Sequence, residues 1–447
     1  MTAPVRRAGA FAALCTLSLV VPLFGPWVAG SVAAIVLVGA IVVTDGPLFD
    51  LLAYPVDYEA GRLYGFVTFV LAVAGLGYLT VATSMTAATF VGAVLLLGYG
   101  ILAEELARSR PDAPDDGDVL AVTAFCVVGT TAAISGQAAS LALEGASIEP
   151  RLPSILFLAA SGAVFAALLR DVMYPHDDPI VLLTVGLLLW LLAELEPAIG
   201  AGEILLALAI TVALGYVSYA LGTASIAGML TGILLGLLTI VLGGYGWFAV
   251  LISFFAIGGL SSKYRYEEKA ARGVAEDNDG ARGSGNVLGN SAIALAAVLG
   301  FAASASGLVP GDPNPELFQY AFAGSVATAM SDTLSSEIGG VFDRPRLITT
   351  LEPVDPGTDG GVTWQGEAAG LAGAAAVAGI AYAFFPEVDL LGAGVVVAAG
   401  VVGMTVDSLL GATLEGNVLG NQGVNFLATL VGAAVCALAV VSVVNVG

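Results

Sequence analysis

The chain has 447 residues, of which 58% are hydrophobic and 11% charged, and its formal net charge is −22. Soluble globular domains carry about 25% charged residues, so this composition excludes a soluble domain and indicates a polytopic membrane protein. The acidic balance also argues against nucleic acid as a partner, because phosphate backbones bind basic surfaces. No feature of the sequence indicates an oligomeric state.

Acidic residues gather in the predicted loops, whereas lysine occurs only at Lys263 and Lys269. Many exposed carboxylates and few lysines suit a chain that folds at very high salt, where charge repulsion is screened. We therefore expect a halophilic archaeal source. The alternative is an acidic loop composition without ecological meaning.

Apolar runs recur along the whole chain, and about 20 residues are enough for a helix to cross the hydrocarbon of a bilayer. Hydropathy predicts an all-α fold, a polytopic transmembrane helical bundle of about fifteen spans. The predicted spans cover residues 8–24, 26–44, 64–82, 86–105, 118–140, 153–170, 180–195, 203–221, 224–242, 246–260, 290–308, 316–333, 366–385, 389–407 and 424–445.

The basic residues orient this bundle through the positive-inside rule. With the Arg6–Arg7 pair in the cytoplasm, alternation of the spans leaves only Arg151 outside. The loops at residues 261–289, 334–365 and 408–423 then all face the cytoplasm, where nucleotides are found. We expect a multi-pass protein of the cell membrane whose active-site loops are cytoplasmic.

The character of the polar residues changes near residue 200. Before it they are mostly loop charges, and after it they cluster into three segments between apolar runs. We predict that residues 1–200 form a membrane scaffold or accessory domain of unknown role. Residues 203–447 are then the active membrane domain.

The first polar segment follows a predicted span and is rich in cations and glycine. Cations beside a glycine-containing turn that enters a helix predict a phosphate cradle of backbone N–H groups and a helix N-terminus. Its candidate residues are Lys263, Arg265, Lys269, Arg282, Gly283, Asn286 and Asn290. Alternatively, the basic residues only anchor the chain to anionic headgroups or set its topology.

The second polar segment ends a predicted span with two carboxylates, Asp332 and Glu337, and with Ser336 one helical turn after Asp332. Mg²⁺ is usually held by one or two carboxylates together with substrate phosphates and water. Asp332 is the strongest candidate because it lies just inside the apolar boundary. The alternative is that Asp332 pairs with an arginine or caps a helix.

A glycine-rich stretch follows, with Gly357, Thr358, Gly360 and Gly361 before the next span. This density of glycines is more typical of a lid or a phosphate loop than of a simple turn.

The third polar segment places Asp407 and Glu415 at four-residue multiples on one helix face, with Ser408 beside them and Asn425 further on. Asp407 at a cytoplasmic membrane edge could supply a second metal ligand, and the alternative is an ordinary loop.

Several common catalytic arrangements are absent from the sequence. No lysine follows a glycine, which excludes a P-loop. The single histidine, His176, excludes a serine–histidine triad and makes a zinc site unexpected. Three cysteines lie in apolar runs without metal or redox spacing.

Taken together, the three segments resemble the plant plastid phytyl-phosphate kinase and its bacterial, archaeal and animal relatives, a membrane family described as domain of unknown function 92. The resemblance covers residues 203–447. It is carried by Arg282-Gly283 with Asn290, Ser331-Asp332-Thr333 with Ser336-Glu337, Pro356-Gly357-Thr358 with Gly360-Gly361-Val362, and Asp407-Ser408 with Thr413. The chain departs from the family pattern at Asn286 and Glu415, where glutamine is usual, and at Leu334, where an aromatic residue is usual.

The resemblance implies a kinase that uses CTP, or another nucleoside triphosphate, with Mg²⁺ to convert an isoprenoid monophosphate such as phytyl or geranylgeranyl phosphate to the diphosphate. Under this hypothesis Asp332, Glu337 and Asp407 hold the metal and act with Arg282 as the catalytic residues. The partners are then the bilayer and a prenyl monophosphate. The remaining candidates contact phosphate or nucleotide: Lys263, Arg265, Lys269, Gly283, Asn286, Asn290, Ser336, Gly357, Thr358, Gly360, Gly361, Ser408 and Asn425.

Two other functions use the same kinds of residue. A cytidylyltransferase that joins CTP to a lipid phosphate needs similar carboxylates and cations. An ion-coupled transporter is the second alternative. Clustering of the polar segments on one side disfavours a transporter, as does the absence of a convincing internal repeat.

Overall fold

The structure is a computed structural model that describes residues 3–110, 117–173, 177–195, 197, 199–272, 282–310, 314–416 and 418–444. His176 lies outside these residues. The chain divides into two compact units, Met1–Leu208 and Ala209–Gly447. Helices account for nearly all regular structure in both units, so the predicted all-α fold is confirmed.

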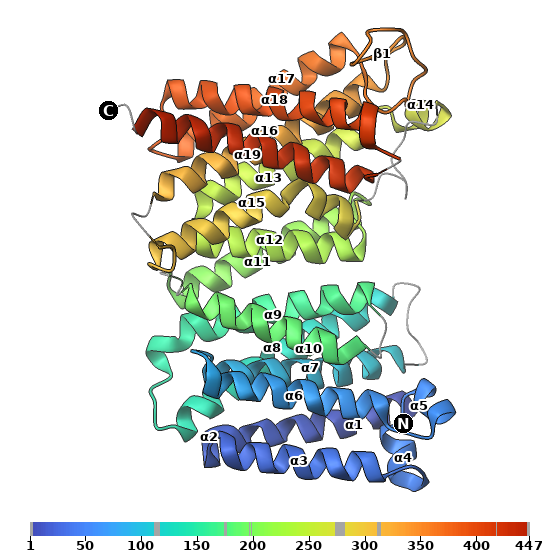
Figure 1. Ribbon diagram of the computed structural model, residues 1–447, viewed down its shortest axis with the longest axis vertical. Coiled ribbons are helices and arrows are strands. Elements are labelled where there is room, and N and C mark those ends of the chain that lie inside the picture. Colours follow the sequence, from blue (N-terminus) through green and yellow to red (C-terminus); the bar gives the residue numbers. More distant parts are fainter. Residues whose placement is uncertain are drawn as a thin grey trace. The chain divides into compact units, whose positions relative to one another are not determined.

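The first unit contains helices α1 to α10, and α11 runs across the division between the units (Figure 1). Two short 3-10 turns, η1 and η2, join the longer helices. The bounds are α1 Ala3–Cys15, η1 Thr16–Leu19, α2 Val20–Phe24, α3 Pro26–Val42, α4 Gly46–Leu52, α5 Pro55–Ala60, α6 Tyr64–Ala82, α7 Ala87–Arg108, α8 Gly117–Leu143, η2 Glu149–Arg151, α9 Leu152–Val172, α10 Asp178–Glu194 and α11 Ala201–Ala220.

The second unit contains the three polar segments. Its helices are α12 Ile226–Gly243, α13 Tyr245–Lys263, α14 Tyr266–Ala271, α15 Ser284–Ala305, α16 Pro315–Gly339, α17 Trp364–Phe384, α18 Leu390–Leu414 and α19 Asn421–Val444. Between α16 and α17, strand β1 (Arg346–Leu347) pairs antiparallel with β2 (Gly361–Val362).

All fifteen predicted spans coincide with helices, yet fewer of them meet the requirements of a membrane span. Among the described residues, twelve helices are long and apolar enough, or up to thirteen if the bent pair α3–α4 forms one span. The helix α3 turns by 111° into α4, and α10 has 17 residues, which is short for a span. The third predicted span that fails the requirements is α16, which has 25 residues but is less apolar than the other long helices of its unit.

The position of α16 explains its lower hydropathy. It packs against α13, α15, α17, α18 and α19, and these helices lie around it in Figure 1. Its buried residues include Ser325, Thr328 and Ser331, all almost fully inaccessible. Because neighbouring helices cover it, α16 does not need a lipid-facing apolar surface.

Close helix packing in this unit depends on glycines that face α16. Gly403 on α18 and Gly432 on α19 both contact the side chain of Thr328, and a Cβ at either glycine would overlap with it. Thr328 Oγ1 donates to the carbonyl of Ala399 at 3.3 Å. Small residues allow such close approach in lipid, where no hydrophobic effect holds helices together.

We predict that Gly432→Leu destabilises the second unit by about 1–3 kcal/mol, because a side chain there must push α19 away from α16. The matched control is Gly379→Leu on α17, where a Cβ meets no atom within 4 Å. Thermal unfolding in detergent should give a lower midpoint for Gly432→Leu alone. Equal midpoints for both variants would contradict this packing.

Candidate functional site

The three polar segments gather at one end of the second unit (Figure 1). Lys269 of α14 forms an ion pair with Glu337 near the end of α16. A Cβ at Gly360 would lie 2.6 Å from the carbonyl oxygen of Ser408, so the glycine-rich loop rests directly on α18. The starts of α15 and α19 also touch, because a Cβ at Gly289 would lie 3.1 Å from the carbonyl oxygen of Gln422.

A pair of carboxylates forms the centre of this end. Asp332 of α16 and Asp407 of α18 are neighbours, and each carboxylate acts directly on the other. Asp407 Oδ1 is buried and has no hydrogen-bond partner. Two carboxylates this close can both be charged only if a cation lies between them. Otherwise the pair holds a proton.

Arg282 supplies a buried guanidinium beside this pair. Arg282 is 5% exposed, and its charge acts on Asp332. The guanidinium lies over the ring of Phe254, with Cζ 5.4 Å from the ring centroid. Its Nε and Nη1 atoms are buried without a hydrogen-bond partner. Unsatisfied donors on a buried cation are costly, and an anion would satisfy them.

The backbone around Arg282 is held from both sides. Its N–H donates to the carbonyl of Thr223 at 3.0 Å, and its carbonyl accepts from Ser225 N–H at 3.1 Å. A Cβ at Gly258 would lie 3.1 Å from Arg282 Nη1, so glycine leaves room there for the side chain of Arg282. These contacts fix the direction in which the cation points.

The first turns of α15 add a helix N-terminus and two amides to the site. Gly283 is the N-cap residue of this 22-residue helix, and helix N-termini favour anions. Asn290 Nδ2 donates to the carbonyl of Asn286 at 3.0 Å. The Oδ1 atoms of both asparagines are buried without a partner, so each could accept a hydrogen bond from a ligand or from water.

The structure gives Lys269 and Glu337 a different environment from the predicted one. Both side chains are buried, at 1% and 8% exposure, and they form an ion pair. Lys269 Nζ also donates to the carbonyl of Ser262 at 2.9 Å. Lys269 is thus engaged by the protein rather than open to phosphate, and Glu337 is directed to Lys269 rather than to a metal. Within the described residues, Asp332, Glu337 and Asp407 do not form a three-carboxylate metal site, although the charge of Glu337 acts on Asp332.

The remaining predicted residues make contacts of other kinds. Arg265 is exposed and paired with Glu268, and Lys263 lies over the ring of Tyr266, with Nζ 5.8 Å from its centroid. Ser336 Oγ donates within its own helix to the carbonyl of Asp332 at 2.8 Å. Asn425, near the start of α19, is buried.

The glycine-rich loop is exposed at its tip. Gly357 and Thr358 are exposed, and Thr358 Oγ1 donates to the carbonyl of Asp355 at 2.8 Å. Gly360 has φ +73° and contacts α18, and Gly361 pairs in β2. A side chain at Gly360 would be both strained and obstructed, so glycine is required there.

One acidic neighbour of the site was not among the predicted site residues. Glu415, directly after α18, acts electrostatically on both Asp332 and Asp407. Burial raises the pKa of Glu415, and the charge of Asp359 raises that pKa further. Its position two turns after Asp407 is the sequence signal that could have identified it.

The site fits Mg²⁺ only as a two-carboxylate arrangement. In the part of the chain that the structure describes, no three His, Cys, Asp or Glu side chains are placed to hold a metal ion together. Mg²⁺ is usually held by one or two carboxylates, with phosphates and water filling the octahedron. The unpartnered Asp407 Oδ1 beside Asp332 meets this requirement.

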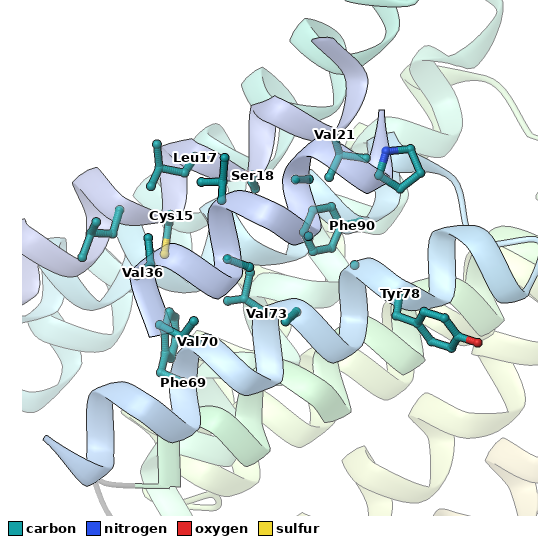
Figure 2. Close-up of a pocket in the computed structure, with 18 of the residues that line it drawn as sticks. Cys15, Leu17, Ser18, Val21, Val36, Phe69, Val70, Val73, Tyr78 and Phe90 are labelled. Carbon is teal, nitrogen blue, oxygen red and sulfur yellow. The ribbon is translucent and has the colours of Figure 1, made fainter. Parts of the chain in front are cut away.

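The first unit has a pocket of a different kind. A cavity of about 220 Å³ lies between α1, α3 and α6. Figure 2 shows Phe69, Val70, Val73 and Phe90 among the side chains that line it. No charged residue is among the described residues that line it, so this pocket has no groups that could bind phosphate.

Comparison with known proteins gives this site its context. Residues 209–433 match the model of a family described as "Integral membrane protein DUF92". The chain belongs to this family. The match covers most of the second unit and all three polar segments, and it confirms the family resemblance inferred from the sequence motifs.

Relatives come from archaea, cyanobacteria and plants. The uncharacterized membrane protein MJ0933 of Methanocaldococcus jannaschii is 36% identical over 211 residues, which are 46% of this chain and 81% of that protein. The uncharacterized membrane protein sll0875 of Synechocystis is 34% identical over 44% of this chain and 75% of its own length. Protein VTE6, chloroplastic, of Arabidopsis thaliana is 33% identical over 43% of this chain and 56% of its own. No solved structure matches the chain.

We predict that Lys269→Met or Glu337→Met alone destabilises the protein by about 3–5 kcal/mol, because each leaves an unpaired buried charge. The double variant Lys269→Met/Glu337→Met removes both charges and should recover much of the lost stability. Unfolding midpoints of the four proteins in detergent check this. Additive losses in the double variant would show that the two residues do not act as a pair.

Proposed function

We propose that this protein is an integral-membrane kinase that transfers the terminal phosphoryl group of CTP, or another nucleoside triphosphate, to an isoprenoid monophosphate. The product is the prenyl diphosphate, and the reaction requires Mg²⁺. The observation that carries the proposal is the carboxylate pair Asp332 and Asp407, in which Asp407 Oδ1 has no hydrogen-bond partner, next to the buried guanidinium of Arg282, whose Nε and Nη1 atoms also have none. The motif resemblance to phytyl-phosphate kinases and the kinship to VTE6 support the same reaction class.

The chain's own residues provide what phosphoryl transfer needs, which is positioning and charge neutralisation. Asp332 and Asp407 would hold Mg²⁺, which when bound neutralises charge on the donor's phosphates. Arg282 binds the phosphate of the acceptor and orients it, and the N-terminus of α15 adds backbone donors on the same side. The loop at Gly357–Gly361 covers the donor phosphates.

The acceptor itself supplies the nucleophile. A phosphate monoester loses its second proton near pH 6, so at neutral pH its oxygen attacks the terminal phosphorus of the donor without a strong protein base. The bond from that phosphorus to the bridging oxygen breaks, and the nucleoside diphosphate leaves. A reaction that needs no strong protein base agrees with a site whose described residues offer carboxylates and a guanidinium but no histidine.

We place this site on the cytoplasmic face of the cell membrane. Nucleotide donors are found there, and the basic residues at this end of the second unit agree with the positive-inside rule. The acidic composition favours an origin in a high-salt organism.

We predict that Asp332→Asn and Asp407→Asn each lower the rate of transfer by about 10²–10³-fold, because each removes a charge that would hold the metal. Membranes containing the protein are given Mg²⁺, γ-labelled CTP and geranylgeranyl phosphate at moderate and at high salt. The matched control is Asp343→Asn, an exposed carboxylate at the same end that pairs with Arg272, and it should retain activity.

Three other results of this labelling experiment would contradict the kinase proposal. If no nucleotide and no chain length gives a labelled prenyl diphosphate, the kinase assignment is wrong. A CDP-linked lipid identified by mass would establish the cytidylyltransferase. Absence of any lipid product, with ion-dependent uptake of a solute, would favour the transporter.

A further inference from the structure

Arg282 also lines an apolar groove that the phosphoryl-transfer site does not use. The groove has a volume of about 270 Å³ and lies between α11, α12, α13 and the start of α15. Its walls include Leu214, Met229, Phe248, Phe255 and Leu260. Among the described residues that line it, Arg282 is the charged one.

The groove has a polar end and an apolar end. At the start of α12, Gly228 and Ala224 lie against the backbone of Arg282. Two turns further along, Gly236 lies against Thr211 of α11 and Phe248 of α13. Eight residues of helix separate Gly228 from Gly236, so the groove continues for about 12 Å away from the cation.

We infer that this groove holds the hydrocarbon chain of a single-chain isoprenoid monophosphate whose phosphate binds Arg282. The assignment rests on the proposed function for the identity of the lipid. Apolar walls exclude a nucleotide. Arg282, the charged residue of the lining, has buried Nε and Nη1 atoms without a hydrogen-bond partner, which an anion would satisfy. Only an amphiphile with an anionic head satisfies both. The volume is close to the lower limit of ligand pockets, about 300 Å³, which suits one chain rather than two.

The arrangement separates the two substrates. The acceptor approaches Arg282 from the groove between α11 and α13. The donor occupies the side of Arg282 that faces Asp332, where the carboxylate pair and the glycine-rich loop lie. The two phosphates then meet at the guanidinium, and the lipid chain does not have to enter the polar part of the site.

The test uses a substitution that fills the groove. A Cβ at Gly232, on the groove wall of α12, meets no atom within 4 Å. The ring of Gly232→Phe can therefore occupy the groove without displacing backbone. Gly379→Phe on α17, equally open and outside the groove, is the matched control.

The probe is a diazirine-bearing geranylgeranyl monophosphate, added to the purified full-length protein in detergent without nucleotide, and the crosslinked peptides are mapped. We expect the label on α11, α12 and α13, at least about tenfold weaker in Gly232→Phe and unchanged in Gly379→Phe. Unlabelled geranylgeranyl phosphate should compete, whereas geraniol and inorganic phosphate should compete poorly. Label elsewhere, or label unaffected by Gly232→Phe, overturns the inference. Equal competition by a two-chain phosphatidic acid overturns the assignment to a single chain.

Turnover separates this inference from the proposed function. Label in the groove without phosphoryl transfer from any nucleotide would leave the groove standing and remove the kinase. Transfer to geranylgeranyl phosphate that Gly232→Phe does not slow relative to dimethylallyl phosphate would keep the kinase and remove the groove.

Discussion

The cost of placing charge at the edge of a bilayer is the constraint on which the second unit depends. An ionised side chain there needs a partner, and Lys269 with Glu337 meets that need by joining α14 to the end of α16. The hydrogen bond from Lys269 Nζ to the carbonyl of Ser262 also holds the end of α13 near this ion pair. With this pair satisfied, the buried atoms of the described residues that lack a hydrogen-bond partner include Arg282 Nε and Nη1, Asp407 Oδ1 and the Oδ1 atoms of Asn286 and Asn290. Unsatisfied groups at one place are the physical signature of a binding site.

The packing of the central helix α16 fixes where the neighbouring helices place their charged residues. Its neighbours approach closely because glycine faces Thr328 from both α18 and α19. That approach also sets the distance between Asp332 and Asp407, which lie on α16 and α18. A polar, well-packed helix in the centre of a membrane unit therefore has two consequences. It is less apolar than the helices around it, and it positions a carboxylate pair that a looser bundle would hold apart.

Much of the fold could be predicted from the sequence, because hydropathy reports the local cost of exposing each segment to water. Every predicted span is a helix, although hydropathy does not reveal the 111° turn from α3 to α4, where Gly46 has φ +81°. The motifs also identified the segments that meet at the site. They did not identify the partners, since Lys269 and Glu337 are 68 residues apart and spacing cannot say which cation meets which carboxylate. For the same reason Glu337 was taken as a metal ligand, and Glu415 was passed over.

Arg282 shows why side-chain direction decides function here. Its backbone is bridged to residues 223–225, its side chain passes Gly258, and its guanidinium ends over Phe254. These contacts fix the position of the guanidinium. On one side its charge acts on Asp332 of the carboxylate pair, and on the other Arg282 lines the apolar groove. Under the proposed function, a single buried cation with such different neighbours would bind phosphate from both substrates while the nucleotide and the lipid chain stay in separate compartments. This separation is what a membrane enzyme needs when one substrate dissolves in water and the other in the bilayer.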